Sequence, residues 1–372
     1  MRIAMIISAP IPPREGIGFY TWNLAHQLTR QGHEVHIITR GCARNTRKEI
    51  IEKVTIWKPP FLPIYPLHVH FHSLFVDWLL GRLRPGFDLL HLHIPLVKHP
   101  KTKLPTLVTV HTPMKADVGS ITPNTPLAIL TKLQAPISIQ LEKEVLHKAV
   151  KITAVAHSVA NELSAYGIDP RIVSVLGNGV DTQTFFPDEV EPVFPHPYIL
   201  TAGRLGLRKG LEDLIQCAQR IIEEHQELIF IIAGEGPLRK KLQNKINQLG
   251  LNKRILLIGH VNDRQQMSQL YRGATIFVHP AHYEGLPAAL LEAMSCACPV
   301  VTTAVSGAVD IIQDGWNGLL VPPHSPEELA KAIKRILGSP GMGKSSVRML
   351  ITLQQDAMTG AWFAKITLPI IN

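Results

Sequence analysis

Cysteine is scarce in this chain of 372 residues, and so are long apolar runs. The four cysteines, Cys42, Cys217, Cys296 and Cys298, are too few and too scattered for a disulfide framework. Cys296 and Cys298 form a lone C-x-C, which argues against zinc and favours small buried thiols in a reducing compartment. No apolar run reaches the roughly 18–20 residues that a bilayer-spanning helix needs, so we expect no transmembrane segment.

Charged residues make up only 18% of the chain and hydrophobic residues 45%, a composition typical of globular proteins and not of disordered ones. The length suits two domains of ordinary size. The amino terminus, MRIAMIISAP, has one basic residue and lacks a polar region with a cleavage site. It therefore predicts a buried first strand instead of a signal peptide, in a cytoplasmic protein.

The net charge of +9 is unevenly distributed. Residues 1–186 hold 20 Lys and Arg against 12 Asp and Glu, a net +8, whereas the remainder is nearly neutral. A basic first half indicates an anionic partner, such as membrane lipid, a phosphorylated acceptor or nucleic acid, although a solubility bias fits the charge equally well. Basic and aromatic residues do not interleave, so we expect no nucleic acid.

Short β-branched runs alternate with helical patterns through most of the chain, which predicts parallel sheets covered on both faces. The first series of expected strands covers residues 3–8, 34–39, 53–57, 89–94, 106–110, 151–156 and 172–176. The second series covers residues 198–203, 228–234, 255–260, 275–280, 299–304 and 318–323.

Residues 178–197 separate the two series, with four prolines and no apolar period. We therefore predict an N-terminal domain 1–180, a linker 181–197 and a C-terminal domain 198–337, both domains being doubly wound α/β and Rossmann-like. Ligands of such sheets bind beyond the carboxyl ends of the strands, so we expect an active site in a cleft between the domains. The tail 338–372 breaks the pattern and receives no assignment.

A glycine-bounded loop with two cations, TAGRLGLRKG at 201–210, follows an expected strand and opens a helix. Arg204 and Lys209 can clamp phosphate oxygens there, beside a helix N-terminus that favours anions. A solvated basic turn explains the loop about equally well. In a second such turn, AGEGPLRKKL, Gly234 and Gly236 can serve turn geometry alone.

Two glutamates eight positions apart mark the stretch HYEGLPAALLEAMSC. Pro287 suits the first turn of a helix that runs to about Cys296, so Glu284 lies in the preceding loop and Glu292 on the second turn. The amides at this helix start attract a diphosphate. Carboxylates would repel that phosphate, so they suit neutral hydroxyls on either side of it, as in a nucleotide sugar. A capping charge and a helix-face charge are the simpler alternative.

Histidines are frequent in the first half. His111, in TVHTP, follows an expected strand at its carboxyl end, which favours a functional role over the structural role usual for a lone histidine. Residues 66–83 are rich in leucine and aromatic side chains and suit a core helix or a membrane surface. Five further histidines lack cysteine or carboxylate partners at ligand spacing, so we expect no metal. They are His68, His70, His72, His91 and His93.

Taken in order, these stretches resemble the retaining glycosyltransferases of the two-domain GT-B class, in the family 4 group of sucrose synthase-like and mannosyltransferase-like enzymes. The resemblance covers roughly residues 1–337. The matching stretches are GIGFYTWNLAHQLTRQGHEVHIIT (16–39), DLLHLHIP (88–95), VTVHT (108–112), ITAVAHSVANEL (152–163), NGVDTQTFFP (178–187), GRLGLRKGLEDLI (203–215), IAGEGPLRKKL (232–242), LIGHV (257–261), HYEGLPAALLEAMSCACPVV (282–301) and DGWNGLLVPP (314–323).

The resemblance implies roles for individual residues. Arg204 and Lys209 would clamp the donor diphosphate, and His111 would lie beside the reacting sugar. Glu284 would contact the hydroxyls of the transferred sugar, and Glu292 those of the ribose. The remaining donor-binding positions that it implies are Gly16, Gly234, Gly236, Val261, Gly285, Leu286, Pro287 and Ala288. It also implies that the reaction needs no metal and no cofactor.

Two features depart from the family pattern. The first-domain loop, REGIG, has Glu15 where a glycine is usual, which would weaken donor binding or change acceptor choice. The tail 338–372 does not resemble the long helix that normally ends the family's chains.

We therefore expect a retaining glycosyltransferase that moves a sugar from a UDP- or GDP-linked donor to a lipid-linked, polysaccharide or other acceptor on the basic first domain. Peripheral association with a membrane is compatible with that charge. The alternatives are a catalytically impaired relic that binds sugar nucleotides, and an epimerase or phosphorylase of the same architecture.

Overall fold

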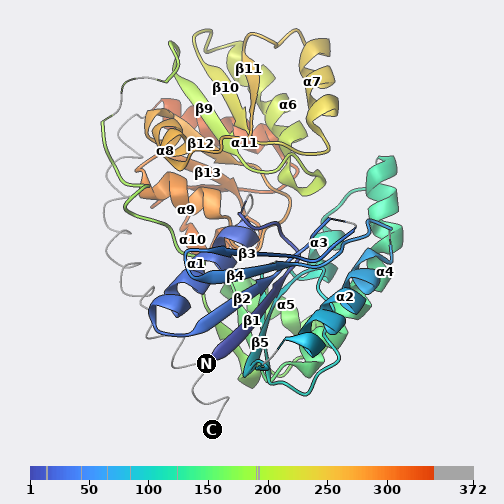
Figure 1. Ribbon diagram of the computed structural model, residues 1–372. Coiled ribbons are helices and arrows are strands. Elements are labelled where there is room, and N and C mark those ends of the chain that lie inside the picture. Colours follow the sequence, from blue (N-terminus) through green and yellow to red (C-terminus); the bar gives the residue numbers. More distant parts are fainter. Residues whose placement is uncertain are drawn as a thin grey trace. The chain divides into compact units, whose positions relative to one another are not determined.

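The computed structural model describes residues 1–338 except 14, 15, 43, 65, 84, 124, 190 and 192. The chain forms two compact units, the first comprising Met1–Asn178 and the second beginning at Gly179. Each unit is built on a sheet of parallel strands with helices between them, as the alternating pattern predicts (Figure 1). The predictions for Glu15 and for the tail beyond residue 338 lie outside the described residues.

The first unit contains an eight-stranded sheet in the order β3-β4-β2-β1-β5-β6-β7-β8. The bounds of its strands are β1 Arg2–Ile7, β2 Glu34–Ile38, β3 Arg47–Ile51, β4 Val54–Lys58, β5 Leu89–Ile94, β6 Thr106–Val110, β7 Lys151–Ala154 and β8 Val173–Val175. Its helices are α1 Gly16–Arg30, α2 His68–Arg82, α3 Met114–Gly119, α4 Pro126–Lys148 and α5 His157–Glu162, with 3-10 turns at Leu163–Tyr166 and Pro170–Ile172.

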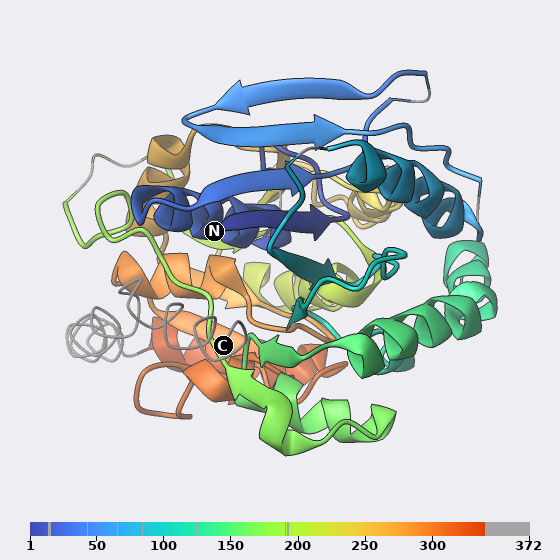
Figure 2. The same cartoon turned by 60° about the horizontal axis from the view of Figure 1, so that its bottom comes forward.

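One strand of this sheet was not predicted. β3 pairs antiparallel with β4 at the sheet edge, and the two arrows run in opposite directions in Figure 2. Glu52 and Lys53, which join the two strands, both have positive φ angles of 47° and 69°. Such a two-residue turn matches the twist of a hairpin, but without Asn or Gly its sequence gives little signal.

The second unit contains a six-stranded parallel sheet in the order β11-β10-β9-β12-β13-β14. The bounds of its strands are β9 Tyr198–Ala202, β10 Ile229–Ala233, β11 Ile255–Gly259, β12 Ile276–His279, β13 Val300–Thr303 and β14 Leu319–Val321. Its helices are α6 Leu211–Ile222, α7 Arg239–Gln248, α8 Arg264–Gly273, α9 Ala288–Ser295, α10 Ala308–Ile311 and α11 Pro326–Leu337, with a 3-10 turn at Leu207–Lys209.

Both faces of this second sheet are buried, because successive strand residues point to opposite sides. On one face Ile199 and Phe230 pack with the apolar residues of α6, α7 and α11. On the other face Tyr198 and Phe277 pack with residues of α8 and α9. The near-continuous apolar strands of the sequence are thus explained by two-sided burial.

The proline-rich segment before β9 is anchored to the second unit. Phe185 is fully buried in its core, and Ser268 Oγ donates a hydrogen bond of 2.7 Å to the carbonyl of Thr184. Arg272 Nε donates to the carbonyl of Phe186 at 2.8 Å.

Among the described residues, no helix is both long and apolar enough to cross a membrane.

Candidate functional site

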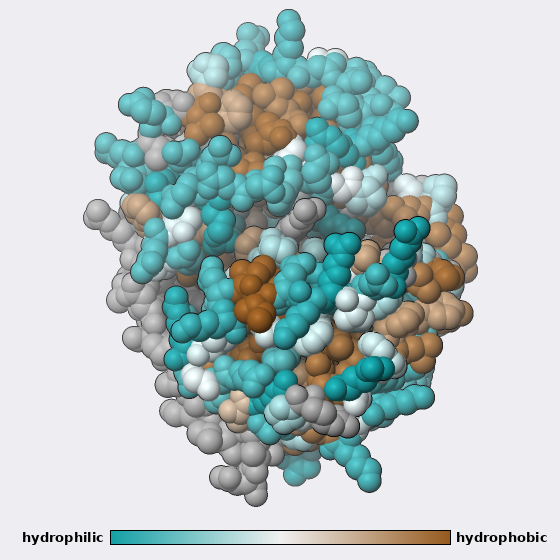
Figure 3. Space-filling view, in the orientation of Figure 1, coloured by the Kyte–Doolittle hydropathy of each residue, from teal (hydrophilic) through white to brown (hydrophobic). Residues whose placement is uncertain are grey.

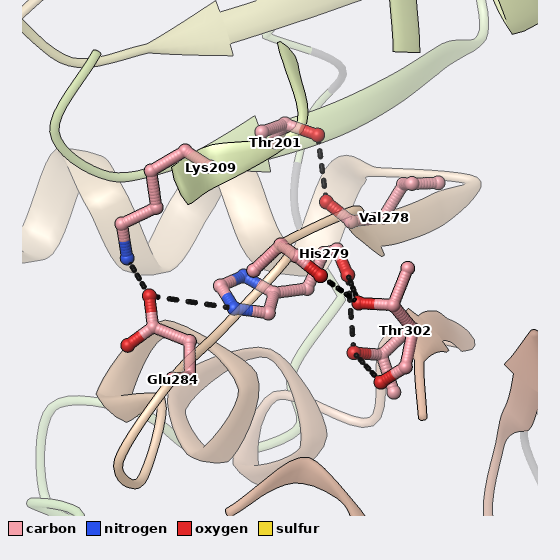
Figure 4. Close-up of polar contacts among 8 residues, drawn as sticks. Thr201, Lys209, Val278, His279, Glu284 and Thr302 are labelled. Atoms are coloured by element: carbon pink, nitrogen blue, oxygen red, sulfur yellow. Dashed lines mark hydrogen bonds and ion pairs between the residues drawn. The ribbon is translucent and has the colours of Figure 1, made fainter. Parts of the chain in front are cut away.

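Lys209 and Glu284 meet at the carboxyl edge of the second sheet. Lys209 ends the 3-10 turn that follows β9, and Glu284 lies in the loop between β12 and α9. Lys209 Nζ donates a hydrogen bond to Glu284 Oε1, and the two form an ion pair (Figure 4). Their side chains are only 20% and 10% exposed. Two loops separated by 75 residues are therefore joined by a largely buried charge pair.

His279, the last residue of β12, lies beside this pair. Its Nε2 is 3.8 Å from Glu284 Oε1 (Figure 4). Its ring also stacks on that of Phe277. Burial, and then the charge of Lys209, lower the pKa of His279 to about 3, so the imidazole is neutral. Thr302 Oγ1 donates to the His279 carbonyl at 3.1 Å, which fixes the end of the strand. His279 was not among the predicted site residues, although its position at the end of a strand was a usable signal.

The loop that holds Arg204 packs directly on the glycine turn after β10. Leu205 N donates to the carbonyl of Glu235 at 2.9 Å, and Leu238 N donates to the carbonyl of Leu205 at 3.1 Å. A Cβ at Gly236 would lie 2.4 Å from the Leu205 carbonyl oxygen, and one at Gly234 would lie 1.9 Å from that of Gly203. Both glycines thus permit close approach of two backbones. Arg204 itself is exposed.

The helix after Glu284 begins one residue later than predicted, because Pro287 caps α9 and does not form part of it. Leu290 N donates to the carbonyl of Pro287 at 3.1 Å, so that amide is already used. The amides of the first turn before it have no acceptor within the helix. The positive end of the α9 helix dipole points at the Glu284 loop, so the binding of an anion at this loop is favourable.

Glu292 projects from the second turn of α9 toward α8. Tyr271 donates a hydrogen bond to its Oε2 at 3.1 Å, and Arg264 Nη1 is 3.8 Å from its Oε1. Burial raises the pKa of Glu292 to about 7, against the opposing effects of Arg264 and the Tyr271 hydrogen bond. The Glu292 side chain as a whole is 19% exposed. Neither Tyr271 nor Arg264 was predicted.

The remaining predicted positions differ in exposure. Gly285 and Pro287 are buried, while Leu286 and Ala288 are half-buried. Val261 is half-buried and packs on the core that contains Phe277. Gly16, in the first unit, is the exposed first residue of α1.

His111 belongs to a stack of buried rings in the first unit. It directly follows β6, and its Nε2 is 3.3 Å from Nδ1 of His93 at the end of β5. Tyr20 of α1 meets the His111 ring edge-on, with centroids 4.9 Å apart. Burial lowers the pKa of His111 to about 3. A neutral imidazole can form a hydrogen bond with a hydroxyl but adds no positive charge.

Comparisons with known proteins define the class. The family described as Glycosyltransferase Family 4 matches residues 14–184, and the family described as Glycosyl transferases group 1 matches residues 186–350. An uncharacterized glycosyltransferase of Methanocaldococcus jannaschii is 28% identical over 365 residues, covering 92% of this chain and 90% of the relative. A D-inositol 3-phosphate glycosyltransferase of Kribbella flavida is 27% identical over 372 residues, covering 89% and 85%.

Solved structures share the fold. The sucrose-phosphate synthase of Thermosynechococcus elongatus superposes with a TM-score of 0.83 at 20% identity, covering 99% of each chain. HepE of Anabaena, solved with UDP and glucose, superposes with a TM-score of 0.73 at 16% identity, covering 99% of each chain. The fold is therefore GT-B, that of a large class of glycosyltransferases. Within that class, the chain belongs to the group 1, family 4 glycosyltransferases.

Proposed function

We propose that this protein is a retaining glycosyltransferase that moves a hexosyl group from a UDP- or GDP-linked donor to a lipid-linked or envelope polysaccharide acceptor. The observation that carries the proposal is the Lys209–Glu284 pair, where a cation and a carboxylate meet in front of a helix N-terminus. A nucleotide sugar presents a diphosphate and a ring of hydroxyls side by side, and this site offers a partner for each.

In this proposal the diphosphate occupies the positive part of the site. Lys209 and Arg204 contact its oxygens, and the first amides of α9 add the positive end of the helix. When the bond between the sugar and the diphosphate breaks, negative charge builds up on the leaving oxygen. Cations and amides that are already in place stabilise that charge without reorganisation, which is the usual source of rate acceleration in such sites.

The two glutamates bind hydroxyls on either side of the diphosphate. Glu284, freed from Lys209 when the phosphate takes its place, accepts hydrogen bonds from the transferred sugar. Glu292, whose side chain is partly exposed, accepts from the ribose through the carboxyl that Tyr271 holds in place. The Anabaena structure contains UDP and glucose, which supports a nucleotide-sugar donor for this fold.

The first unit binds the acceptor and contributes His111 beside the reacting sugar. Since burial keeps its imidazole neutral, His111 forms a hydrogen bond with a sugar hydroxyl instead of acting as a cation. Retention of the anomeric configuration, which the resemblance in the sequence implies, belongs to the same proposal.

A lipid-linked acceptor fits the surface of the first unit. Apolar side chains gather over α4 (Figure 3), where Leu127, Ile129, Leu130 and Leu133 are 42–73% exposed. Helix α2, within the stretch 66–83, buries Val76 and exposes more than half of Trp78. Together with the net charge of +8 in residues 1–186, these surfaces favour peripheral docking on an anionic membrane, which we place at its inner face.

The function is tested by incubating the protein with a panel of UDP- and GDP-sugars and measuring nucleoside diphosphate release, with and without anionic lipid extract. We expect nucleoside diphosphate release from one donor, stimulated by the lipid acceptor. The anomeric carbon of the product should have the same configuration as that of the donor, as read from the anomeric proton signal by NMR. Binding of nucleotide sugars without release under all acceptors would instead identify a non-catalytic binding protein.

A further inference from the structure

A second cluster of side chains lies at the carboxyl edge of the second sheet, apart from the Lys209–Glu284 pair. Among the residues described, Asp213, His282 and His324 form a group with metal-ligand chemistry and spacing. Asp213 is on the first turn of α6, after β9, and His282 is in the loop after β12. His324 lies between β14 and α11. Three segments that follow three strands of one parallel sheet therefore converge through these side chains.

The distances within the cluster are short. His282 Nε2 is hydrogen-bonded to Asp213 Oδ2 at 2.7 Å, and the rings of His282 and His324 are tilted by 31° with centroids 3.6 Å apart. One ligand atom from each residue lies within 4.8 Å of the other two. Zinc bonds to imidazole nitrogen and carboxylate oxygen are about 2.0–2.2 Å long, so tetrahedral ligands stand about 3.4 Å apart. Shifts of about 1 Å in the positions of the three ligand atoms would bring them to that spacing.

The surroundings suit a transition-metal cation. Asp213 and His282 are only 20% and 14% exposed at their side chains, whereas His324 is exposed and leaves the cluster open to solvent. Two imidazoles and one carboxylate are typical ligands of zinc and related ions, while magnesium and calcium prefer oxygen ligands.

We propose that Asp213, His282 and His324 bind one Zn²⁺, with water in the fourth position. The bound ion would tie the first turn of α6, which follows Lys209, to the loop that holds Glu284 two residues after His282. His282 N already donates to the Arg208 carbonyl at 2.7 Å, so the two loops are in contact at this point. The ion acts as a clamp on the loops of the second unit and takes no part in sugar transfer.

The clamp is tested on the full chain, prepared without a polyhistidine tag and stripped of metal by a chelator. Titration with zinc chloride in a calorimeter should give one saturable site per chain, and saturation should raise the melting temperature. The same titration with magnesium chloride should give no site. Because binding is measured directly, the result is independent of whether the donor and acceptor proposed above are correct.

Variants assign the site to these residues. His324→Ala should weaken zinc binding about tenfold or more and abolish the rise in melting temperature. His260→Ala, which removes another exposed histidine of the second unit, is the matched control and should bind as the wild type does. Asp213→Asn keeps the shape of the carboxylate and should also weaken binding. Absence of a saturable zinc site, or a site that survives both His324→Ala and Asp213→Asn, would overturn the proposal.

Discussion

The Lys209 ammonium and the Glu284 carboxylate neutralise one another in a largely buried ion pair. The two residues are proposed to bind opposite parts of one donor, its diphosphate and its sugar. When a diphosphate binds to Lys209, it replaces the Glu284 carboxylate as the anionic partner of the ammonium group. The new ion pair therefore offsets the loss of the old one at the moment of binding. The same exchange frees Glu284 to accept sugar hydroxyls, which couples recognition of the phosphate to recognition of the sugar.

Removal of Lys209 should destabilise the second unit. Lys209→Met leaves the buried Glu284 carboxylate without its counter-charge, so we expect the free energy of unfolding in urea to fall by about 2–3 kcal/mol. The double variant Lys209→Met, Glu284→Gln should recover most of that loss. Lys334→Met, which breaks the exposed pair with Glu224, is the control and should cost less than about 1 kcal/mol. Equal losses in both lysine variants would mean that the Lys209 pair is an ordinary surface contact.

The buried carboxyl of Glu292 should make stability depend on pH. Its pKa is raised from 4.5 to about 7, so between these values the folded protein keeps a proton that the unfolded chain has lost. The resulting stabilisation is full below pH 4.5 and is lost as the pH rises through 7. As the pH rises from 4.5 to 7, the free energy of unfolding of Glu292→Gln should therefore increase by about 2–3 kcal/mol relative to that of the wild type. Above pH 7 the difference should stay constant. A difference that is constant from pH 4.5 to 8 would refute this burial effect.

The buried histidines should give the first unit the opposite pH dependence. Burial lowers the pKa of His91 to about 3, so the folded protein excludes a proton that the unfolded chain binds below about pH 6.5. The stability is full above pH 6.5 and falls toward pH 3. In urea titrations between pH 6.5 and 4.5, His91→Gln should reduce the slope by about 1.4 kcal/mol per pH unit.

The control for this experiment is His147→Gln, since His147 is exposed on α4 of the same unit. Its slope should equal that of the wild type. If the His91 variant also keeps the wild-type slope, this histidine is accessible to protons in the folded state and the packing described here is wrong.

Exposed leucines of α4 should govern membrane binding. We expect the protein to sediment with phosphatidylglycerol vesicles and less with phosphatidylcholine vesicles, because apolar contact and basic charge act together. Leu133→Asp places a charge at the most exposed of these leucines and should release most of the bound protein. Leu249→Asp alters an exposed leucine of the second unit and should have no effect. Equal release by both variants would exclude α4 as the docking surface.

The strands and most helix positions could be predicted because their signals are local. Near-continuous apolar runs identify strands buried on two sides, and this pattern located 13 of the 14 strands found among the described residues. Strand β3 was not predicted because its residues are exposed or half-buried and the turn that follows it lacks glycine. The helix after Glu284 was placed within one residue because Pro287 marks its start.

The contacts of the candidate site could not be predicted in the same way, because they join distant segments. The loop chemistry and the family resemblance predicted separate roles for Glu284 and Lys209, but only the sheet order brings the ends of β9 and β12 together. The same holds for Tyr271 and Glu292, which depend on the packing of α8 against α9. His279 was not predicted either, although its place at the carboxyl end of an expected strand is a signal that the sequence carries.

The most direct test of the central claim is equilibrium binding of a nucleoside diphosphate and of the matching nucleotide sugar by calorimetry. The account predicts that Lys209→Ala weakens both ligands at least about tenfold, because both carry the diphosphate. It predicts that Glu284→Gln leaves the nucleoside diphosphate bound as in the wild type and weakens only the nucleotide sugar. Unchanged diphosphate binding in Lys209→Ala, or equal losses for both ligands in Glu284→Gln, would contradict it.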